Sequence, residues 1–252
     1  MRASMETVAK ASGTSVDQGD RQRHRDGRLR GLPLAATLLR HRAIYRRFRH
    51  FTMIPRQAYL ANLYLAARCL AAPAMAGGCI IECGTWRGGM AAGLATIGGA
   101  ARDYHFFDSF AGLPPASAED GDYARDAQAR RDGRLYFDNN TAALEDLMAA
   151  FARVALPPER LHVHKGFFAD TFPGVSVPPI AVLRLDADWY GSTLLCLEKF
   201  WGRLMPGALM LIDDYYDWEG CTKAVHEFLA RRGAVEPIRQ SRFGKVAYLL
   251  KR

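Results

Sequence analysis

The spacing of apolar and polar residues changes character near residue 73 of this chain. Before it, a polar opening rich in arginine gives way to two stretches with helical spacing, separated by Pro55. The residue before a proline avoids the helical region, so Pro55 ends the first stretch. After residue 73, short apolar runs alternate with amphipathic segments. We therefore expect a disordered basic tail over 1–32, a helical cover over the ligand edge at 33–72, and a main domain over 73–252.

Seven short apolar runs in the main domain predict its strands. Runs of this length are typical of buried parallel strands, and the amphipathic segments between them are typical of crossover helices. The last two runs flank Arg242-Phe-Gly244 and predict a hairpin. We expect a doubly wound, mostly parallel α/β sheet with one terminal antiparallel hairpin. The predicted strands are Cys79–Glu82, Tyr104–Phe107, Leu161–His164, Ile180–Leu185, Ala208–Ile212, Val235–Arg239 and Lys245–Leu250.

The segments between these runs predict helices and one insertion. Residues 112–140 contain LPP, EDGD and many arginines, which is typical of a long polar insertion. Ser192 or Thr193 is the expected cap of the helix that follows the fourth strand. The other helices are expected at Met90–Ile97, Thr141–Val154 and Thr222–Arg231.

Four aspartates follow the fourth and fifth predicted strands: Asp186, Asp188, Asp213 and Asp214. Adjacent parallel strands end about 5 Å apart at one edge of a sheet, so these carboxylates are expected at one rim. Carboxylates cannot share a small site without cations or raised pKa values. Oxygen donors without a nearby His or Cys cluster favour Mg²⁺ over zinc. The alternative is that the aspartates cap the helices that follow.

The turn after the first strand predicts a cofactor loop. Gly84 lets the backbone approach a ligand, and Gly88 and Gly89 permit tight turning before the helix. Their spacing is not GxGxxG, which disfavours a pyrophosphate loop. Glu82 suits a cationic ligand part such as a methionyl amino group, and Asp108 after the second strand suits a ribose diol. The two acids point to an adenosyl cofactor, with helix or loop capping as the alternative.

Charge and cysteine content limit the partners and the cellular compartment that we expect for this protein. The first 50 residues hold 12 Lys or Arg and 4 Asp or Glu, which accounts for the net charge of +8, so the remaining chain is balanced. That segment could touch nucleic acid, anionic lipid or an acidic partner, but we expect a solvated tail and no nucleic-acid or membrane partner. No apolar run approaches the ~20 residues of a membrane span, and no signal-peptide core is present. The five cysteines form no CxxC pair. We expect a soluble cytoplasmic protein with reduced cysteines.

Five motifs in order resemble the macrocin O-methyltransferase family: ECGTWRGG, FDSFAGLP, KGFFADTFP, LRLDADWYGST and IDDYYDWEGC. The similarity runs from about Thr52 to Leu250. Members of this family are Rossmann-like class I methyltransferases that require magnesium and methylate sugar hydroxyls on antibiotic scaffolds. The resemblance therefore implies S-adenosyl-L-methionine and Mg²⁺ as cofactors, and a glycosylated small molecule as substrate.

The resemblance also implies roles for individual residues. Asp188 is implied as the general base, with Asp186, Asp213 and Asp214 as metal ligands. Residues 52–54 are implied to form a lid, and 166–168 to lie beside the adenine. Near the rim, Trp189, Tyr190 and Tyr215 either stack on the substrate or pack in the core. The implied cofactor residues are Thr52, Met53, Glu82, Gly84, Thr85, Trp86, Gly88, Asp108, Ser109, Gly166, Phe167, Phe168 and Asp186.

Three other functions remain open. A catechol-type O-methyltransferase would keep the fold, but such enzymes have a lysine base where Trp189 stands here. A nicotinamide oxidoreductase is disfavoured by the missing GxGxxG, and a non-catalytic binding protein by the intact carboxylates. Acceptor choice is expected near Met53 and within 112–140. A homodimer or higher oligomer is expected, because the cover helix at Tyr59–Leu70 has more apolar surface than one domain buries.

Overall fold

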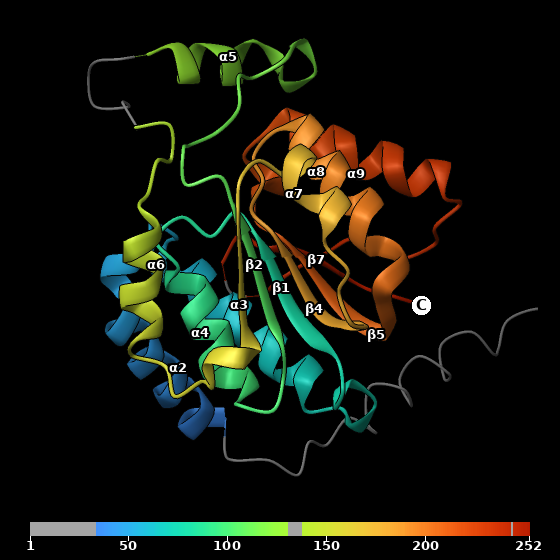
Figure 1. The fold of residues 1–252 in the computed structure, drawn as a ribbon. Helices are drawn as coiled ribbons and strands as arrows, with labels where there is room; N and C mark the ends of the chain where they lie inside the picture. Colours follow the sequence, from blue (N-terminus) through green and yellow to red (C-terminus); the bar gives the residue numbers. More distant parts are fainter. Residues whose placement is uncertain (1–33, 131–137, 243) are drawn as a thin grey trace, which may run out of the picture. The chain divides into compact units, whose positions relative to one another are not determined.

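A computed structural model describes residues 34–130, 138–242 and 244–252. A seven-stranded sheet lies at its centre, in the order β3-β2-β1-β4-β5-β7-β6 (Figure 1). Strands β1 to β5 are parallel, whereas β7 runs antiparallel to both β5 and β6. The predicted fold is therefore confirmed, and the predicted tail lies outside the described residues. The strands are β1 Cys79–Cys83, β2 Tyr104–Asp108, β3 Leu161–Lys165, β4 Ile180–Leu185, β5 Leu204–Ile212, β6 Arg239–Gln240 and β7 Ala247–Leu250.

Helices cover both faces of the sheet. Figure 1 shows α3, α4 and α6 on one face and α7, α8 and α9 on the other. Two separate apolar clusters fill the two layers between helices and sheet. This is the arrangement that right-handed crossovers produce when a parallel sheet is wound in both directions. The helices are α2 Leu34–Phe48, α3 Arg56–Leu70, α4 Gly89–Gly98, α5 Gly121–Ala129, α6 Leu144–Phe151, α7 Phe168–Thr171, α8 Tyr190–Phe200 and α9 Glu219–Arg231.

Helix α3 differs from its predicted role as a cover over the ligand edge. It packs on the face of the sheet, against β4, β5 and α4. Tyr59 and Leu63 are fully buried there, and the Tyr59 hydroxyl donates a hydrogen bond to the Gly89 carbonyl at 2.9 Å. Because much of the apolar face of α3 is buried within its own chain, it gives no support to the oligomer that the sequence suggested. The oligomeric state stays a prediction.

Helix α8 begins earlier than the sequence predicted. Its first residue is Tyr190, so Ser192 and Thr193 lie inside the helix and do not cap it. The Tyr190 N–H is instead satisfied by a carboxylate oxygen of Asp120, at 2.6 Å. A cap can come from any chain segment that brings an acceptor to the helix start, and sequence spacing predicts only the local ones.

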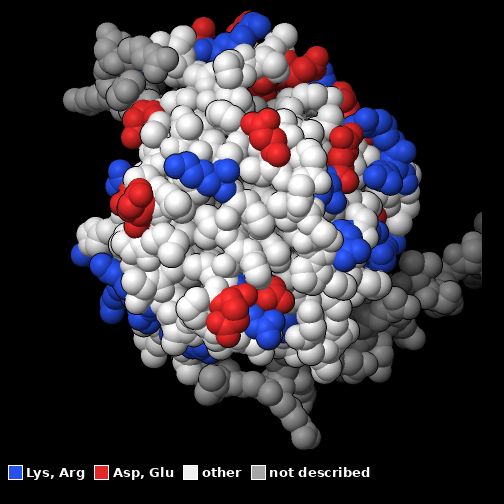
Figure 2. Space-filling view, viewed as in Figure 1, with Lys and Arg blue, Asp and Glu red and all other residues white. Residues whose placement is uncertain are grey.

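The charged residues do not separate by sign on the face drawn in Figure 2. Lys and Arg side chains are interspersed there with Asp and Glu around a largely uncharged centre. Among the described residues, no helix combines the length and the apolar character needed to cross a bilayer.

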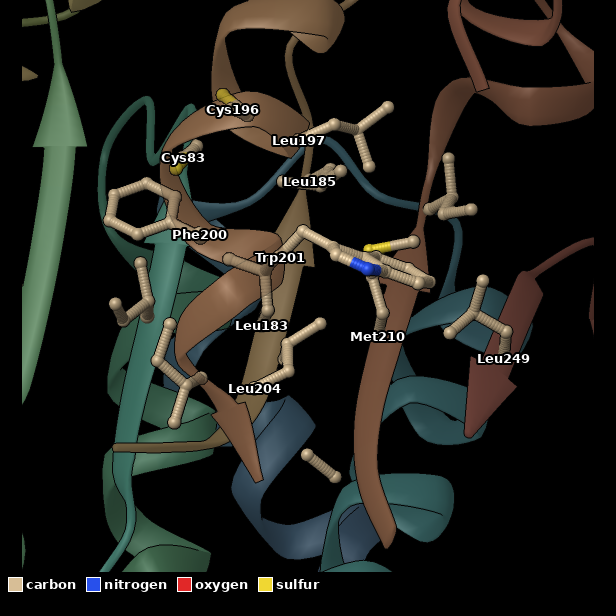
Figure 3. Close-up of a cluster of buried hydrophobic side chains, with 14 of the residues drawn as sticks. Cys83, Leu183, Leu185, Cys196, Leu197, Phe200, Trp201, Leu204, Met210 and Leu249 are labelled. Carbon is tan, nitrogen blue, oxygen red and sulfur yellow. The ribbon is translucent and has the colours of Figure 1, made fainter. Parts of the chain in front are cut away.

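The core beneath α8 is built from large apolar side chains and two thiols. In Figure 3, Leu197 and Phe200 from α8 face Leu183 and Leu185 from β4. Burying one such side chain stabilises the fold by about 1.5–3 kcal/mol, so this layer is a main source of stability. The five cysteines are unpaired, and four of them are buried.

Three histidines stack at the β2–β3 edge of the sheet. His105 Nδ1 lies 3.2 Å from His164 Nε2, and the His105 and His162 rings stack at 4.5 Å between centroids. Asp103 accepts a hydrogen bond from Arg160 and lies 3.4 Å from His162. Burial and the neighbouring imidazoles lower the pKa of His105 to about 4, and the same causes lower the pKa of His164. The surroundings of His105 and His164 therefore favour their neutral rings.

We expect His105 to lower the stability of the folded protein as the pH falls below about 6.5. Between the ordinary histidine pKa and the lowered one of His105, this side chain binds more protons in the unfolded chain than in the folded chain, so at this position acid favours unfolding. By pH 5 the loss from His105 is up to about 2 kcal/mol. Urea unfolding at pH 5 and 7 measures it. Between pH 7 and pH 5, His105→Gln should gain stability relative to wild type by about this amount, whereas His50→Gln, at an exposed position, should not; identical pH dependences for all three proteins would contradict the prediction.

Candidate active site

A cavity of about 470 Å³ lies at the carboxyl ends of β1, β2, β4 and β5. Gly84, after β1, has φ +83, and a Cβ there would lie 1.7 Å from the Asp186 carbonyl oxygen. Only glycine permits the loops after β1 and β4 to touch. Strand β2 lies on one side of β1 and β4 lies on the other, so the winding of the sheet changes direction at β1. This is the topological switch point at which doubly wound sheets bind ligands.

The predicted site residues divide into those that line this cavity and those that do not. Residues 53–55, which precede α3, also border it, although α3 itself does not. The predicted residues in the lining are Met53, Gly84, Trp86, Asp108, Ser109, Phe167, Phe168, Asp186, Asp188, Trp189, Asp213 and Asp214. Those outside it are Thr52, Glu82, Thr85, Gly88, Gly166, Tyr190 and Tyr215.

Asp108 holds the loop after β1 in place. Its Oδ2 accepts hydrogen bonds from the backbone N–H groups of Thr85 at 2.7 Å and Trp86 at 2.8 Å. Its Oδ1 accepts one from the Phe110 N–H at 2.8 Å. Burial raises the pKa of Asp108, while these N–H groups oppose the shift. The Thr85 hydroxyl also lies 3.5 Å from Oδ2, whereas Oδ1 accepts a single bond among the described residues, so the open lone-pair position of this carboxylate is on Oδ1.

Thr85, Gly88 and Gly166 support the site from outside the lining. Gly88 has φ +79, and a Cβ there would lie 2.9 Å from the Leu147 side chain, so glycine lets α6 approach the loop. The Gly166 N–H donates to the Asp108 carbonyl at 2.9 Å, which fixes the turn before Phe167 and Phe168. These residues shape the loops that present the lining.

A buried arginine, Arg184, lies beneath the carboxylates. Its Nη1 donates to Glu82 at 2.5 Å and to Asp186 at 2.8 Å, and its Nη2 forms an ion pair with Asp213 at 2.8 Å. The sequence prediction missed this residue. The available signal was a charge inside an apolar strand, two positions before Asp186 and so on the same face of the sheet.

Glu82 was expected to contact a cationic part of the cofactor, and the structure places its side chain away from the cavity. Its side chain is fully buried, outside the cavity lining, and bonded to Arg184. The physical reason is the register, because Glu82 on β1 pairs directly with Arg184 on β4. Burial raises the pKa of Glu82 to about 8, against the opposing attraction of Arg184. Glu82 therefore acts on the cavity through Arg184 and Asp186.

Three carboxylates converge at the rim: Asp186, Asp188 and Asp214. Each offers an oxygen, and these oxygens all lie within 4.8 Å of one another. The expected ligand set had Asp213 in place of Asp188. The structure differs because Arg184 attracts Asp213, while the Asp188 N–H donates to the Asp214 carboxylate at 3.0 Å and holds those two residues together.

The three carboxylates of the cluster have too little positive charge around them to offset their burial and mutual repulsion. Burial is the main cause that raises the pKa of Asp186 to about 6 and that of Asp188 to about 8, and neighbouring carboxylates add to the shift. The same causes place the pKa of Asp214 well above its usual range. Hard oxygen donors that resist ionisation together are chemically suited to a divalent cation such as Mg²⁺.

The backbone at Asp188 is strained. Its φ is +56, and the Trp189 N–H donates to the Ala187 carbonyl at 2.6 Å, which closes a tight turn around Asp188. Such conformations in residues other than glycine cost about 1–3 kcal/mol and cluster at functional sites. The side chain is fixed as well, because the indole N–H of Trp218 donates to Asp188 Oδ1 at 3.0 Å.

Two of the three predicted substrate aromatics face away from the cavity. The Tyr190 hydroxyl donates to Glu227 at 2.7 Å, and the Tyr215 hydroxyl lies 2.8 Å from His226 Nε2, so both are bound to side chains of α9. Trp189 does line the cavity, although it is 2% exposed and its indole N–H donates to the Pro114 carbonyl at 2.9 Å. Its role is to join the start of α8 to the insertion.

The first part of the insertion forms one wall of the cavity. Residues 112–115 line it and are held by Gln128 of α5. The Gln128 side chain accepts from the Ala116 N–H at 2.7 Å and donates to the Pro114 carbonyl at 2.9 Å and to Asn139 at 2.8 Å. The sequence predicted an insertion but no helix in it, and α5 is what makes the wall rigid.

The sheet order and the cavity at the switch point define the class I methyltransferase fold. Solved structures agree with this assignment. The O-methyltransferase NovP superposes with a TM-score of 0.65 at 24% identity, covering 80% of this chain and 82% of that one. The calicheamicin methyltransferase CalS11 superposes with a TM-score of 0.54 at 20% identity, covering 86% and 91%.

Within that class, the chain belongs to the macrocin-O-methyltransferase (TylF) family, whose sequence profile matches residues 35–248. It is 39% identical over 167 residues to the 8-demethyl-8-(2,3-dimethoxy-alpha-L-rhamnosyl)-tetracenomycin-C 4'-O-methyltransferase of Streptomyces olivaceus, covering 64% of this chain and 61% of that one. It is 34% identical over 169 residues to the mycinamicin III 3''-O-methyltransferase of Micromonospora griseorubida, covering 64% of each. The matches therefore span less than two thirds of these relatives.

Proposed function

We propose that the protein is an S-adenosylmethionine- and Mg²⁺-dependent O-methyltransferase that acts on a sugar hydroxyl of a glycosylated small molecule. The observation that carries this proposal is the cluster of Asp186, Asp188 and Asp214, which opens onto the same cavity as the loop at Gly84. The names of the two relatives, one acting on a rhamnosyl tetracenomycin and one on mycinamicin III, support the substrate class.

The cavity suits the adenosyl cofactor on the side of β1 and β2. Asp108 offers a carboxylate for a ribose diol, and Phe167 and Phe168 supply aromatic surface. The close approach of the Gly84 backbone leaves room for a ligand beside it. When bound, this cofactor supplies a methyl carbon activated by a sulfonium.

The acidic rim suits proton transfer and cation binding. We assign Asp186 and Asp214 as the principal cation ligands and Asp188 as the group that accepts the hydroxyl proton. No hydrogen bond between described residues reaches Oδ2 of Asp188, so this oxygen is left for the proton. A bound Mg²⁺ ion supplies positive charge that favours the deprotonated forms of an acceptor hydroxyl and of the carboxylates.

Calorimetric titration of S-adenosylmethionine, followed by a transfer assay, tests this function. We expect wild type to bind the cofactor and, with Mg²⁺ and p-nitrophenyl α-L-rhamnoside, to form S-adenosylhomocysteine. Asp108→Asn should weaken cofactor binding by about 10-fold or more through the lost ribose contact. Asp103→Asn, immediately before the other end of the same strand, is the matched control. No binding by wild type would overturn the function, and binding without transfer to any glycoside would overturn the substrate class.

We expect Mg²⁺ binding to release protons at pH 7. Asp188 and Asp214 have raised pKa values, so they are partly protonated without a cation, and the ion must displace those protons. Affinity should therefore rise as the pH increases from 6 to 8. Titrations in two buffers of different ionisation enthalpy measure the release. Asp188→Asn should reduce it, and binding heats that do not depend on the buffer would contradict the prediction.

A further inference from the structure

We propose that Trp218 is a positioning residue, whose indole N–H holds the Asp188 carboxylate in the orientation that receives the acceptor proton. This inference rests on the proposed function and deepens it. The indole Nε1 lies 3.0 Å from Asp188 Oδ1, and no other side-chain hydrogen bond among the described residues reaches that carboxylate. Asp188 is 8% exposed, so water has little access to replace the indole.

Asp188 has few ways to reorient while this bond is made. Its N–H is held by Asp214, and its backbone has a left-handed φ of +56. The remaining freedom lies in the side-chain torsions, and the indole removes it by fixing Oδ1. Oδ2 is then the oxygen presented to a proton. Without the indole, the carboxylate can rotate and exchange its two oxygens.

The indole itself is held from several sides. Its ring packs edge-on against Trp189, with centroids 4.9 Å apart at 71°. The Tyr123 ring of α5 covers it, with the two ring centroids 5.6 Å apart. The backbone N–H of Trp218 donates to the Asp214 carbonyl at 3.0 Å. Trp189 is in turn bonded to Pro114 of the cavity wall. Trp218 therefore joins the insertion to the carboxylate that we assign to proton transfer.

The chemistry of indole suits this task. Its N–H is a donor only, so it stabilises a carboxylate oxygen and cannot take the proton in its place. Leaving a buried carboxylate oxygen without its donor is costly, because hydrogen bonds to charged groups are among the strong ones. A phenyl ring at this position would keep the packing on Trp189 and lose the donor.

Trp218→Phe is therefore the informative variant. With p-nitrophenyl α-L-rhamnoside as the probe, we expect kcat to fall ~10–100-fold, the range of one hydrogen bond to a charged group. KM and cofactor affinity should stay within about 3-fold, because the indole is not assigned a contact with either ligand. Loss of folding would also lower the apparent kcat at unchanged KM, so kcat is calculated per active site, counted from the calorimetric stoichiometry of S-adenosylmethionine binding. An unchanged kcat would overturn the proposal.

A second readout does not depend on catalysis. Titrating Mg²⁺ into wild type should change tryptophan emission, because the cation alters the charge beside the Trp218 indole. Trp218→Phe should lose most of that change, whereas Trp201→Phe, in the core beneath α8, should keep it. A Mg²⁺-dependent emission change of undiminished size in Trp218→Phe would overturn the contact, since only the part that comes from Trp86 and Trp189, which also line the cavity, should survive.

Tyr123→Ala gives an independent test if Trp218→Phe folds poorly. Tyr123 is 63% exposed, so its removal spares the core, and kcat should fall about 2–5-fold at unchanged KM as the indole loosens. An unchanged kcat in this variant would count against the proposal. Failure of wild type to bind S-adenosylmethionine would instead overturn the proposed function, whereas an active wild type with an equally active Trp218→Phe would overturn only the positioning role.

Discussion

Asp188→Asn is expected to reduce methyl transfer by about 10²–10⁴-fold, the usual contribution of a positioned proton acceptor. An amide has the shape of the carboxylate but cannot take the proton, and its oxygen can still accept the bond from Trp218. Binding of S-adenosylmethionine should remain, because Asp108 and the loop at Gly84 lie on the other side of the cavity. Single-turnover rates, together with calorimetric cofactor binding, separate the two effects.

Two further variants distinguish the loss of the proton acceptor from the loss of the cation. Asp214→Asn should weaken Mg²⁺ binding, whereas Asp188→Asn should change it much less, because Asp214 is assigned as a principal ligand. Asp217→Asn is the matched control from the same loop, since Asp217 is exposed and its ion pair among the described residues is with Lys245 on the surface. If Asp188→Asn retained wild-type transfer rates, another group would have to accept the proton.

Arg184→Met is expected to destabilise the fold by about 3–5 kcal/mol, the cost of removing one partner from a buried ion pair. Methionine keeps much of the volume but leaves Glu82, Asp186 and Asp213 without their shared cation. The free energy of unfolding from urea titration measures the loss. It should be largest at high pH, where Glu82, with a pKa of about 8, is fully ionised.

The companion variants test whether charge is the cause. Glu82→Gln combined with Arg184→Met should recover part of the lost stability, because the most deeply buried carboxylate is then neutral. Arg125→Met removes an exposed arginine from the surface and should change stability by less than about 0.5 kcal/mol. A single Arg184→Met variant as stable as wild type would show that the carboxylates are neutral in the folded protein.

The sheet followed from the sequence because its determinants are local. Each buried strand is a short apolar run, and parallel strands place the residues that follow them at one edge. Asp108, Asp186, Asp188 and Asp214 could therefore be assigned to one rim before any geometry was known. Helix α5 could not, because Gly121–Ala129 is only 9 residues long and largely polar, so its amphipathic spacing does not stand out within a polar insertion.

Contacts between residues far apart in the chain could not be predicted from the sequence. Whether Arg184 meets Glu82 depends on the register of β1 against β4, and that pairing is also what takes Asp213 away from the expected ligand set. The capping of α8 by Asp120 joins residues 70 positions apart. Tyr190 and Tyr215 sit next to rim aspartates in the sequence, yet their partners on α9 decide where the rings point.

The cavity wall at residues 112–115 has a backbone that other residues hold in place, which matters for engineering. The side chains of Gln128 and Trp189 both donate to the Pro114 carbonyl, so this part of the backbone is held by residues outside the wall and not by the side chains that face the cavity. Leu113 and Pro115 are such side chains. A combinatorial library confined to these two positions would reshape the pocket without disturbing its frame.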